Sequence, residues 1–251
     1  MIKLLRLGYA RLHTELLGNF RVLKNCKLKD SNGSNIFLNT QYCSDPESGI
    51  RCLSTDIFDS NGQKKAYNTF EINNETREFS GFNMNVINTE DRQKHGYGEV
   101  LRLSSIIELM ENNLKKIAIF SLNNAIPFHY KYKFKPVIFS KDEAMSILNE
   151  ISYEKNPVLE KQRNASIKLL DEMIFEGQFP SSVNTGEKFM MLLNEYLSEV
   201  QKNKIPWFSK THIRCVNLTS DLSMELDRDT ILKNKNYFNQ LFEKHGFDYR
   251  L

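Results

Sequence analysis

Two glycines stand one residue apart in the segment QKHGYG (residues 93–98), directly before a regular apolar pattern. Glycine costs backbone entropy, so a chain carries it where something approaches the main chain closely or where φ is positive. A glycine-rich turn that leads into a helix directs several backbone N–H groups and the positive end of the helix dipole at one point, which suits an anion. The segment therefore predicts a phosphate or pyrophosphate site. The alternative is a tight strand-to-helix turn that serves no ligand.

Two other phosphate motifs and the common metal motifs are not met. The dinucleotide fingerprint needs a third glycine and strands that alternate with helices, and the P-loop needs a lysine followed by a hydroxyl residue. The cysteines at 26, 43, 52 and 215 form no C-x-x-C pair and have no histidines at metal-ligand spacing. We therefore expect free thiols and no metal site.

The elements around the glycine segment form a ββββ-α-β-α-β unit. Four stretches rich in β-branched and aromatic residues, separated by turn residues, predict an antiparallel meander. A helix then follows, because Val100, Leu103, Ile107 and Met110 recur at helical spacing. A buried strand, a short helix with Pro127 in its first turn and a further strand complete the unit. The predicted ranges, in order, are 34–43, 49–58, 65–73, 77–88, 98–113, 114–122, 123–134 and 135–140.

The flanking segments read as mainly helical. Leu5, Tyr9, Leu12 and Leu16 fall at helical spacing and predict an amphipathic helix at the start of the chain. Three helical segments are predicted over 140–203, then a strand over 205–217 and a helix from 220 to a C-cap at Gly246. The organisation expected is a core over 1–140, a helical elaboration over 141–203, and a final strand and helix over 204–251 that pack on the core.

The glycine segment resembles the pyrophosphate-binding motif Q/R-x-x-G-x-G/A of the GNAT (GCN5-related N-acetyltransferase) superfamily. A second match lies in residues 123–134, which are similar to the family signature N-x-x-A-x-x-F-Y-x-K-x-G-F at Ala125, Phe128, Lys131 and Phe134. The resemblance covers roughly residues 34–140. It implies an α+β fold with a mixed, mostly antiparallel GNAT-type sheet flanked by helices, here with additional C-terminal helices.

The resemblance also implies an activity and a set of site residues. The activity is transfer of an acyl group from acetyl-CoA to an amine acceptor of unknown type, by direct transfer. The strand before the turn would line the pantetheine arm, with the N–H groups of about Ile87 and Asn88 directed at the thioester oxygen. The implied cofactor-binding residues are Val86, Ile87, Asn88, Gln93, Lys94, His95, Gly96, Tyr97, Gly98, Glu99, Asn124 and Phe128.

Three positions depart from the family pattern. His129 stands where the family has the tyrosine that protonates the leaving thiolate, and Tyr130 is next to it. An imidazole has a pKa suited to proton transfer near neutrality, so His129 is the candidate acid, with Tyr130 as the second candidate. The alternative is that His129 only packs between helix and sheet. Lys133 replaces the usual glycine, and the helix-opening asparagine is displaced to Asn123 or Asn124.

No general base can be assigned from the sequence. The candidates are Glu71 and Glu78, which lie on consecutive predicted strands, but a solvated strand end is the favoured explanation of each. The resemblance also implies that a water chain can replace a single carboxylate.

Composition limits the classes of partner. The chain has 251 residues, 34 basic and 31 acidic, with a net charge of +3, which does not favour a nucleic-acid partner. The first twenty residues are interrupted by Lys3, Arg6 and Arg11, which predicts neither a signal peptide nor a membrane segment. We expect a cytoplasmic protein of bacterial type, and a homodimer is left open. The alternative to an enzyme is a non-catalytic GNAT-fold protein that binds CoA or a protein partner.

Overall fold

The structure is a computed structural model, and it divides the chain into two compact units. The first comprises Met1–Ala118 with Asp227–Leu251, and the second comprises Ile119–Leu226. The model describes scattered positions between 157 and 202 and the continuous ranges 14–17, 20–44, 51–88, 94–121, 125–136 and 222–251. Described positions from 160 to 202 are helical. The bounds of the three predicted helices there, and the predicted strand over 205–217, lie outside the described residues.

The first unit opens with a short hairpin where the sequence predicted a helix. Strand β1 (Thr14–Leu17) pairs with β2 (Phe20–Leu23) antiparallel, with Leu16 opposite Arg21. The helix prediction is therefore wrong at Leu16, and its residues before Thr14 lie outside the described ones. The signal that competed with helical spacing was Gly18-Asn19, a two-residue hairpin connection between two apolar runs.

The predicted four-strand meander is confirmed. Strands β4, β5, β6 and β7 pair antiparallel in sequence order, and β3 pairs antiparallel with β4. Buried side chains alternate with more exposed ones along β4 to β6, so one face of the sheet carries the core. The strands are β3 (Cys26–Lys29), β4 (Asn35–Ser44), β5 (Arg51–Asp59), β6 (Lys64–Asn73) and β7 (Glu78–Val86).

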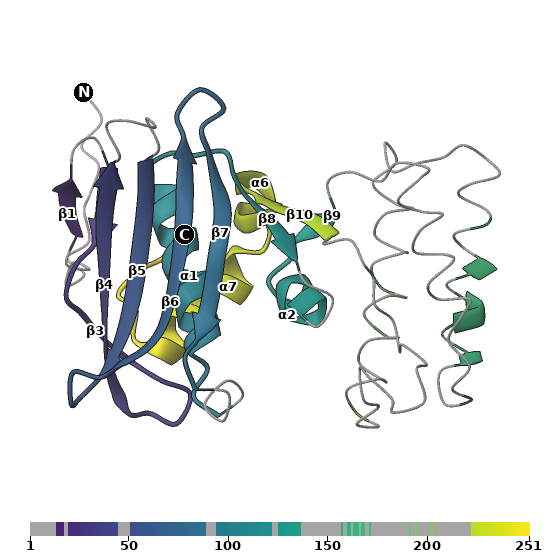
Figure 1. Ribbon diagram of the computed structural model, residues 1–251, viewed down its shortest axis with the longest axis horizontal. Helices are drawn as coiled ribbons and strands as arrows, with labels where there is room; N and C mark the ends of the chain where they lie inside the picture. The colour runs from purple at the N-terminus through teal and green to yellow at the C-terminus, as the bar shows by residue number, and fades with distance from the viewer. Residues whose placement is uncertain are drawn as a thin grey trace. The chain divides into compact units, whose positions relative to one another are not determined.

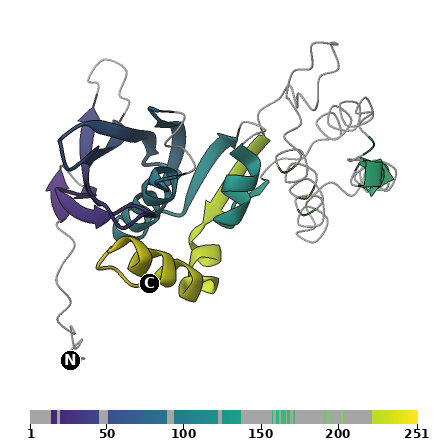
Figure 2. The ribbon, with the colours of Figure 1, turned by 90° about the horizontal axis from the view of Figure 1, so that it is seen from below.

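Helix α1 (Tyr97–Glu111) follows β7 and fills the centre of the first unit. It contacts β5, β6 and β7 on one side and the C-terminal helices α6 (Arg228–Lys233) and α7 (Lys235–His245) on the other. Figure 1 shows the meander from the face opposite α1, and Figure 2 shows α1 between the sheet and the yellow C-terminal helices. Because α1 is enclosed, even its polar side chains Glu99, Arg102 and Glu108 are buried.

The crossover from β7 through α1 leads to β8 (Lys116–Ser121), which lies beside β7 in the sheet. A strand–helix–strand connection between neighbours makes this pair parallel, within a sheet that is otherwise mostly antiparallel. The predicted fold class, α+β with a mixed sheet flanked by helices, is confirmed.

In the sheet order, β8 is followed by β10 (Leu222–Asp227) and β9 (Lys135–Pro136). Helix α2 (Ile126–Lys131) precedes β9 and has proline in its first turn, as predicted. The predicted strand over 135–140 is described only at Lys135–Pro136.

The prediction of a helix from residue 220 is wrong over β10. Met224 and Leu226 are buried and alternate with more exposed residues, which is the period of a strand. Leucine, methionine and glutamate favour helix locally, and pairing with β9 overrides that preference. Helical structure begins only at Arg228, where the Asp227 carboxylate accepts from the Thr230 N–H as an N-cap. The predicted C-cap at Gly246 is confirmed, with φ of 75°.

Among the described residues, none of the helices combines the length and the apolar character needed to cross a bilayer.

Candidate active site

The turn between β7 and α1 contains Lys94, His95 and Gly96. Gly96 adopts the left-handed conformation, with φ 67° and ψ 21°, and is the N-cap residue of α1. Its carbonyl accepts from the Val100 N–H at 3.1 Å. The first N–H groups of an α-helix have no acceptor within the helix, and no side chain in the described part of the chain caps this end. The positive end of a 15-residue helix is therefore presented at the turn, as the glycine segment predicted.

The turn between β3 and β4, residues 30–34, contacts the turn that contains Gly96. The Ser31 N–H donates to the His95 carbonyl at 2.9 Å. A Cβ placed on Gly96 would overlap the Ser31 hydroxyl. Gly96 is thus required both by its positive φ and by this close approach. The tight-turn interpretation accounts for Gly96, so any ligand-specific role of the glycines falls on Gly98, the second residue of α1.

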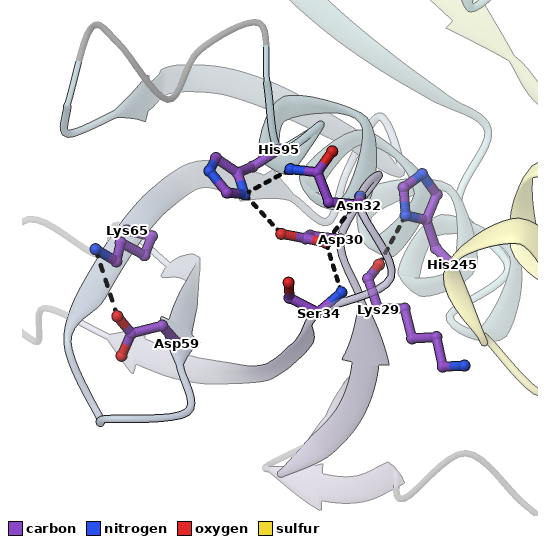
Figure 3. A network of polar contacts seen from close by, with 8 residues as sticks. All are labelled: Lys29, Asp30, Asn32, Ser34, Asp59, Lys65, His95 and His245. Atoms are coloured by element: carbon purple, nitrogen blue, oxygen red, sulfur yellow. Dashed lines mark hydrogen bonds and ion pairs between the residues drawn. The ribbon is translucent and has the colours of Figure 1, made fainter.

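The His95 ring is fixed by a network that Figure 3 shows. Its Nδ1 lies 2.6 Å from Oδ2 of Asp30, whose side chain is almost completely buried. Oδ1 of Asp30 accepts from the backbone N–H groups of Asn32 and Ser34 at 2.9 and 2.8 Å. The Asn32 amide nitrogen also lies 3.3 Å from Nδ1 of His95. Nδ1 cannot donate to a carboxylate and accept from an amide at once, and the shorter contact indicates that Nδ1 carries a proton directed at Asp30.

A second network lies in the first turn of α1. The buried Glu99 carboxylate contacts Lys244 Nζ at 2.6 Å and His245 Nε2 at 2.7 Å. His245 Nδ1 lies 2.8 Å from the Lys29 carbonyl. Both nitrogens of His245 thus face oxygen atoms, the Glu99 carboxylate on one side and the Lys29 carbonyl on the other. Lys244 offsets the charge of Glu99, which would otherwise oppose an anion at the helix start.

These two networks were missed by sequence reasoning. Asp30 and His95 are 65 residues apart, and His245 and Glu99 are 146 apart. The sequence indicated a helix end at Gly246, and no local pattern pairs that helix or Asp30 with the start of α1.

The end of β7 departs in detail from the predicted thioester site. Val86 is buried, and the side chains of Ile87 and Asn88 are exposed. The Ile87 N–H donates to the Lys65 carbonyl at 2.9 Å. This N–H group is engaged in strand pairing in the structure, so a role in binding the thioester oxygen would require that bond to open.

A β-bulge lies earlier in β7. Thr69 pairs with Asn83 and Phe70 pairs with Gly81, so the register leaves Phe82 as an extra residue without a counterpart on β6. Bulges interrupt the hydrogen-bond ladder and are frequent next to active sites. The signal available in the sequence was Gly81, since glycine inside a strand often marks a bulge.

In the second unit, the α2 segment places His129 inside an aromatic cluster. The ring of His129 is 5.2 Å from Phe128 and 5.5 Å from Phe134, and the residue is 7% exposed. Tyr130 is only half-buried. These aromatic surroundings agree with the alternative that His129 only packs between helix and sheet. The role of His129 as the acid stays a prediction. Gln93 and Asn124 lie outside the described residues.

The second motif of the sequence receives support from the backbone at Lys133. This lysine has φ of 67°, the left-handed conformation that glycine adopts without strain. The residue type departs from the family pattern, whereas the backbone keeps the conformation for which glycine is suited.

We expect Lys133→Gly to stabilise the protein by about 1 kcal/mol, because the left-handed conformation costs a residue with a Cβ about 1–2 kcal/mol. The matched control is Lys131→Gly, at the last residue of α2, which should destabilise by about 0.5–1 kcal/mol. Chemical denaturation of both variants measures the difference. Equal destabilisation by the two changes would contradict the strain argument.

No group of three or more histidine, cysteine, aspartate or glutamate residues within the described ranges is arranged to hold a metal ion. Glu78 forms an ion pair with Lys116 at 3.4 Å, and Glu71 lies on the half-buried face of β6 opposite Ser80 and Cys52. Of the two carboxylates weighed as general base, Glu78 thus has a structural partner.

No protein-family model matches the sequence, and no curated protein matches it significantly. Several solved structures show partial likeness to this chain, including the following three. The crystal structure of Tetrahymena GCN5 is 19% identical with a TM-score of 0.32, over 36% of this chain and 54% of that one. A spermidine N-acetyltransferase SpeG chimera from Vibrio cholerae and hSSAT is 15% identical with a TM-score of 0.30, over 35% and 54%. Nourseothricin acetyltransferase is 11% identical with a TM-score of 0.30, over 50% and 83%.

This chain therefore spans about half the length of the first two of these proteins. The first of these proteins is GCN5, and the other two are named as acetyltransferases.

Proposed function

We propose that this protein is an N-acyltransferase that moves an acetyl group from acetyl-CoA to an amine acceptor. The observation that carries the proposal is the junction of β7 and α1, where a left-handed glycine opens a long helix whose start no described side chain caps. This junction coincides with the motif Q/R-x-x-G-x-G/A and lies between adjacent strands β7 and β8.

The pyrophosphate of CoA is the group that this junction suits. Backbone N–H groups at a helix start bind phosphate oxygens without a side chain. Gly98 lies in the first turn of α1 and is only partly buried, so a ligand would meet backbone there. Lys94 is exposed beside the turn and adds a positive charge. His95, held by Asp30, is the further group that would face a phosphate.

Acyl transfer at this site would proceed in one step between two bound substrates. The amine nitrogen attacks the thioester carbonyl carbon, a C–N bond forms, and the C–S bond breaks. The departing sulfur takes a proton from an acid, for which His129 and Tyr130 are the candidates, and the amine loses a proton to a base or to water. The acceptor is an amine, and its class is set by parts of the chain that the glycine turn does not include.

A non-catalytic protein that binds CoA is the second candidate function. It is favoured by one observation, the burial of His129 among aromatic rings, which would suit a residue that packs and does not transfer protons. Both candidate functions place CoA at the same site, and only the acyltransferase would convert acetyl-CoA to CoA.

Gly98→Asp tests the CoA site by a change of charge at the start of α1. An aspartate in the first turn of a helix is favourable to the helix dipole, by about 0.3–1 kcal/mol. The same charge would repel a pyrophosphate bound to the N–H groups of that turn. We expect wild-type protein to bind CoA with a Kd of the order of 1 μM, about 8 kcal/mol, and the variant to bind at least about 100-fold more weakly by calorimetry.

Gly98→Ala is the matched control, since it adds the Cβ without the charge and should raise helix stability by about 1 kcal/mol. It should keep more of the CoA affinity than Gly98→Asp does. Equal affinity in the wild type and the aspartate variant, with both folded, would place CoA elsewhere on the protein.

A further inference from the structure

Two cysteines lie directly opposite each other on neighbouring antiparallel strands. Cys43 on β4 pairs with Cys52 on β5, one position before the last pair of this ladder, Ser44 with Arg51. Residues opposite each other in an antiparallel pair point to the same face of the sheet, with Cα atoms about 4.5–5.5 Å apart. That separation falls within the range of about 4.4–6.8 Å that disulfides span. The two sulfurs can therefore be joined with little backbone movement.

The two thiols differ in access and in environment. Cys43 is exposed and Cys52 is half-buried. Burial raises the pKa of the Cys52 thiol, and the nearby charges of Glu71 and of a Cys43 thiolate raise it further. An oxidant in solution thus meets the exposed Cys43 first, because Cys52 is less accessible and its raised pKa lowers the share of reactive thiolate.

We propose that Cys43 and Cys52 form a modification site for low-molecular-weight disulfides of the glutathione class, which convert the pair into a cross-strand disulfide. The Cys43 thiolate attacks one sulfur of the small disulfide and displaces a thiolate, which leaves a mixed disulfide on Cys43. The Cys52 thiol then gives its proton to solvent, and its sulfur attacks Cys43 Sγ and displaces the second small thiol. Two protein thiols are oxidised and one small disulfide is reduced to two thiols.

The product would tie β4 to β5 at the end of their ladder. The same cross-strand row continues from Cys52 to Glu71 on β6 and from there to Ser80 on β7. Oxidation would therefore replace the Cys52 thiol, opposite Glu71, by a disulfide that has no proton to lose. This inference does not depend on the proposed acyl transfer.

The experiment uses the full chain, reduced and then freed of reductant, with an excess of oxidised glutathione. Intact mass and tryptic mapping are the measurements. Trypsin cleaves after Arg51 and separates the two cysteines, so the disulfide would join two peptides, residues 30–51 and 52–64. We expect the wild type to become lighter by two hydrogen atoms and to yield this linked pair.

Single variants separate the two steps. Cys52→Ser should stop at the mixed disulfide and keep one glutathionyl group on Cys43. Cys43→Ser should leave Cys52 unmodified over the same time. A wild type that accumulates a glutathionyl group on Cys43 with Cys52 still reduced would overturn the proposal. So would a disulfide to Cys26 or Cys215 in place of the Cys43–Cys52 bond, or the absence of reaction at both positions.

Discussion

His129→Phe should lower kcat for acetyl transfer by a factor of about 100 to 10,000, the usual effect of losing one acid catalyst. Phenylalanine keeps a ring between Phe128 and Phe134, where His129 makes its aromatic contacts, and it carries no proton to donate. It is therefore a better test than alanine, which would leave a cavity in the cluster. The measurement is the steady-state release of CoA thiol with a panel of polyamines, amino acids and lysine peptides.

Tyr130→Phe is the matched control at the neighbouring, more exposed position. CoA affinity by calorimetry should be nearly unchanged in both variants, so that the loss appears in kcat. Were Tyr130→Phe to carry the loss instead, the tyrosine would be the acid and His129 a packing residue. Unchanged rates in both variants would mean that the thiolate departs without a side-chain acid. No turnover with any amine in the wild type would favour the non-catalytic alternative.

The second large effect concerns Glu108, a carboxyl group in the core of the first unit. One oxygen of Glu108 accepts from the Leu23 N–H at 3.3 Å, and its side chain is hydrogen-bonded to Thr40. Burial raises the pKa of Glu108 from 4.5 to about 7, and the two hydrogen bonds counteract only part of that shift. Glu108 is therefore largely protonated in the folded protein below neutral pH.

The sign of the pH dependence follows from this shift. Between the unfolded pKa of 4.5 and the folded pKa of about 7, the folded chain binds more protons than the unfolded chain. The contribution of Glu108 to the free energy of unfolding is greatest below the unfolded pKa of 4.5. It is lost as the pH rises through the folded pKa of about 7. From about pH 5 to about pH 8 the wild type should lose roughly 2–3 kcal/mol of unfolding free energy through this residue.

Glu108→Gln should remove that loss, since the amide can accept from Leu23 N–H and donate to Thr40 without titrating. Urea denaturation of both proteins at the two pH values measures the difference between them. Glu75→Gln, in an exposed turn, is the control and should leave the wild-type pH dependence in place. A Glu108→Gln protein that loses as much stability as the wild type would show that the buried carboxyl does not titrate in this range.

Local sequence signals predicted much of the fold. Alternation and turn residues located β4 to β7, and helical spacing located α1 to within a residue of its observed start. These elements are long, and their periodicity agrees with the face that they bury. The glycine turn was found because positive φ and close approach both select for glycine.

Pairing between distant segments was harder to predict. The hairpin of β1 and β2 and the strand β10 have sequences compatible with helix, and cross-strand partners decide their structure. Asp30 and His245 sit at the start of α1 only because β3 and α7 are folded against it, which no local pattern indicates. Lys133 was interpreted as a departure from a motif, although its backbone has the left-handed conformation for which glycine is suited.

The central claim is that CoA binds at the start of α1, and backbone NMR of ¹⁵N-labelled protein titrated with CoA tests it most directly. The amide signals of Tyr97, Gly98 and Glu99 should shift together and saturate with one CoA per chain. Pantetheine, which lacks the pyrophosphate, should leave these three amides in place at the same concentration. Saturable binding of CoA that moves other amides and leaves those of residues 97–99 unshifted would contradict the account.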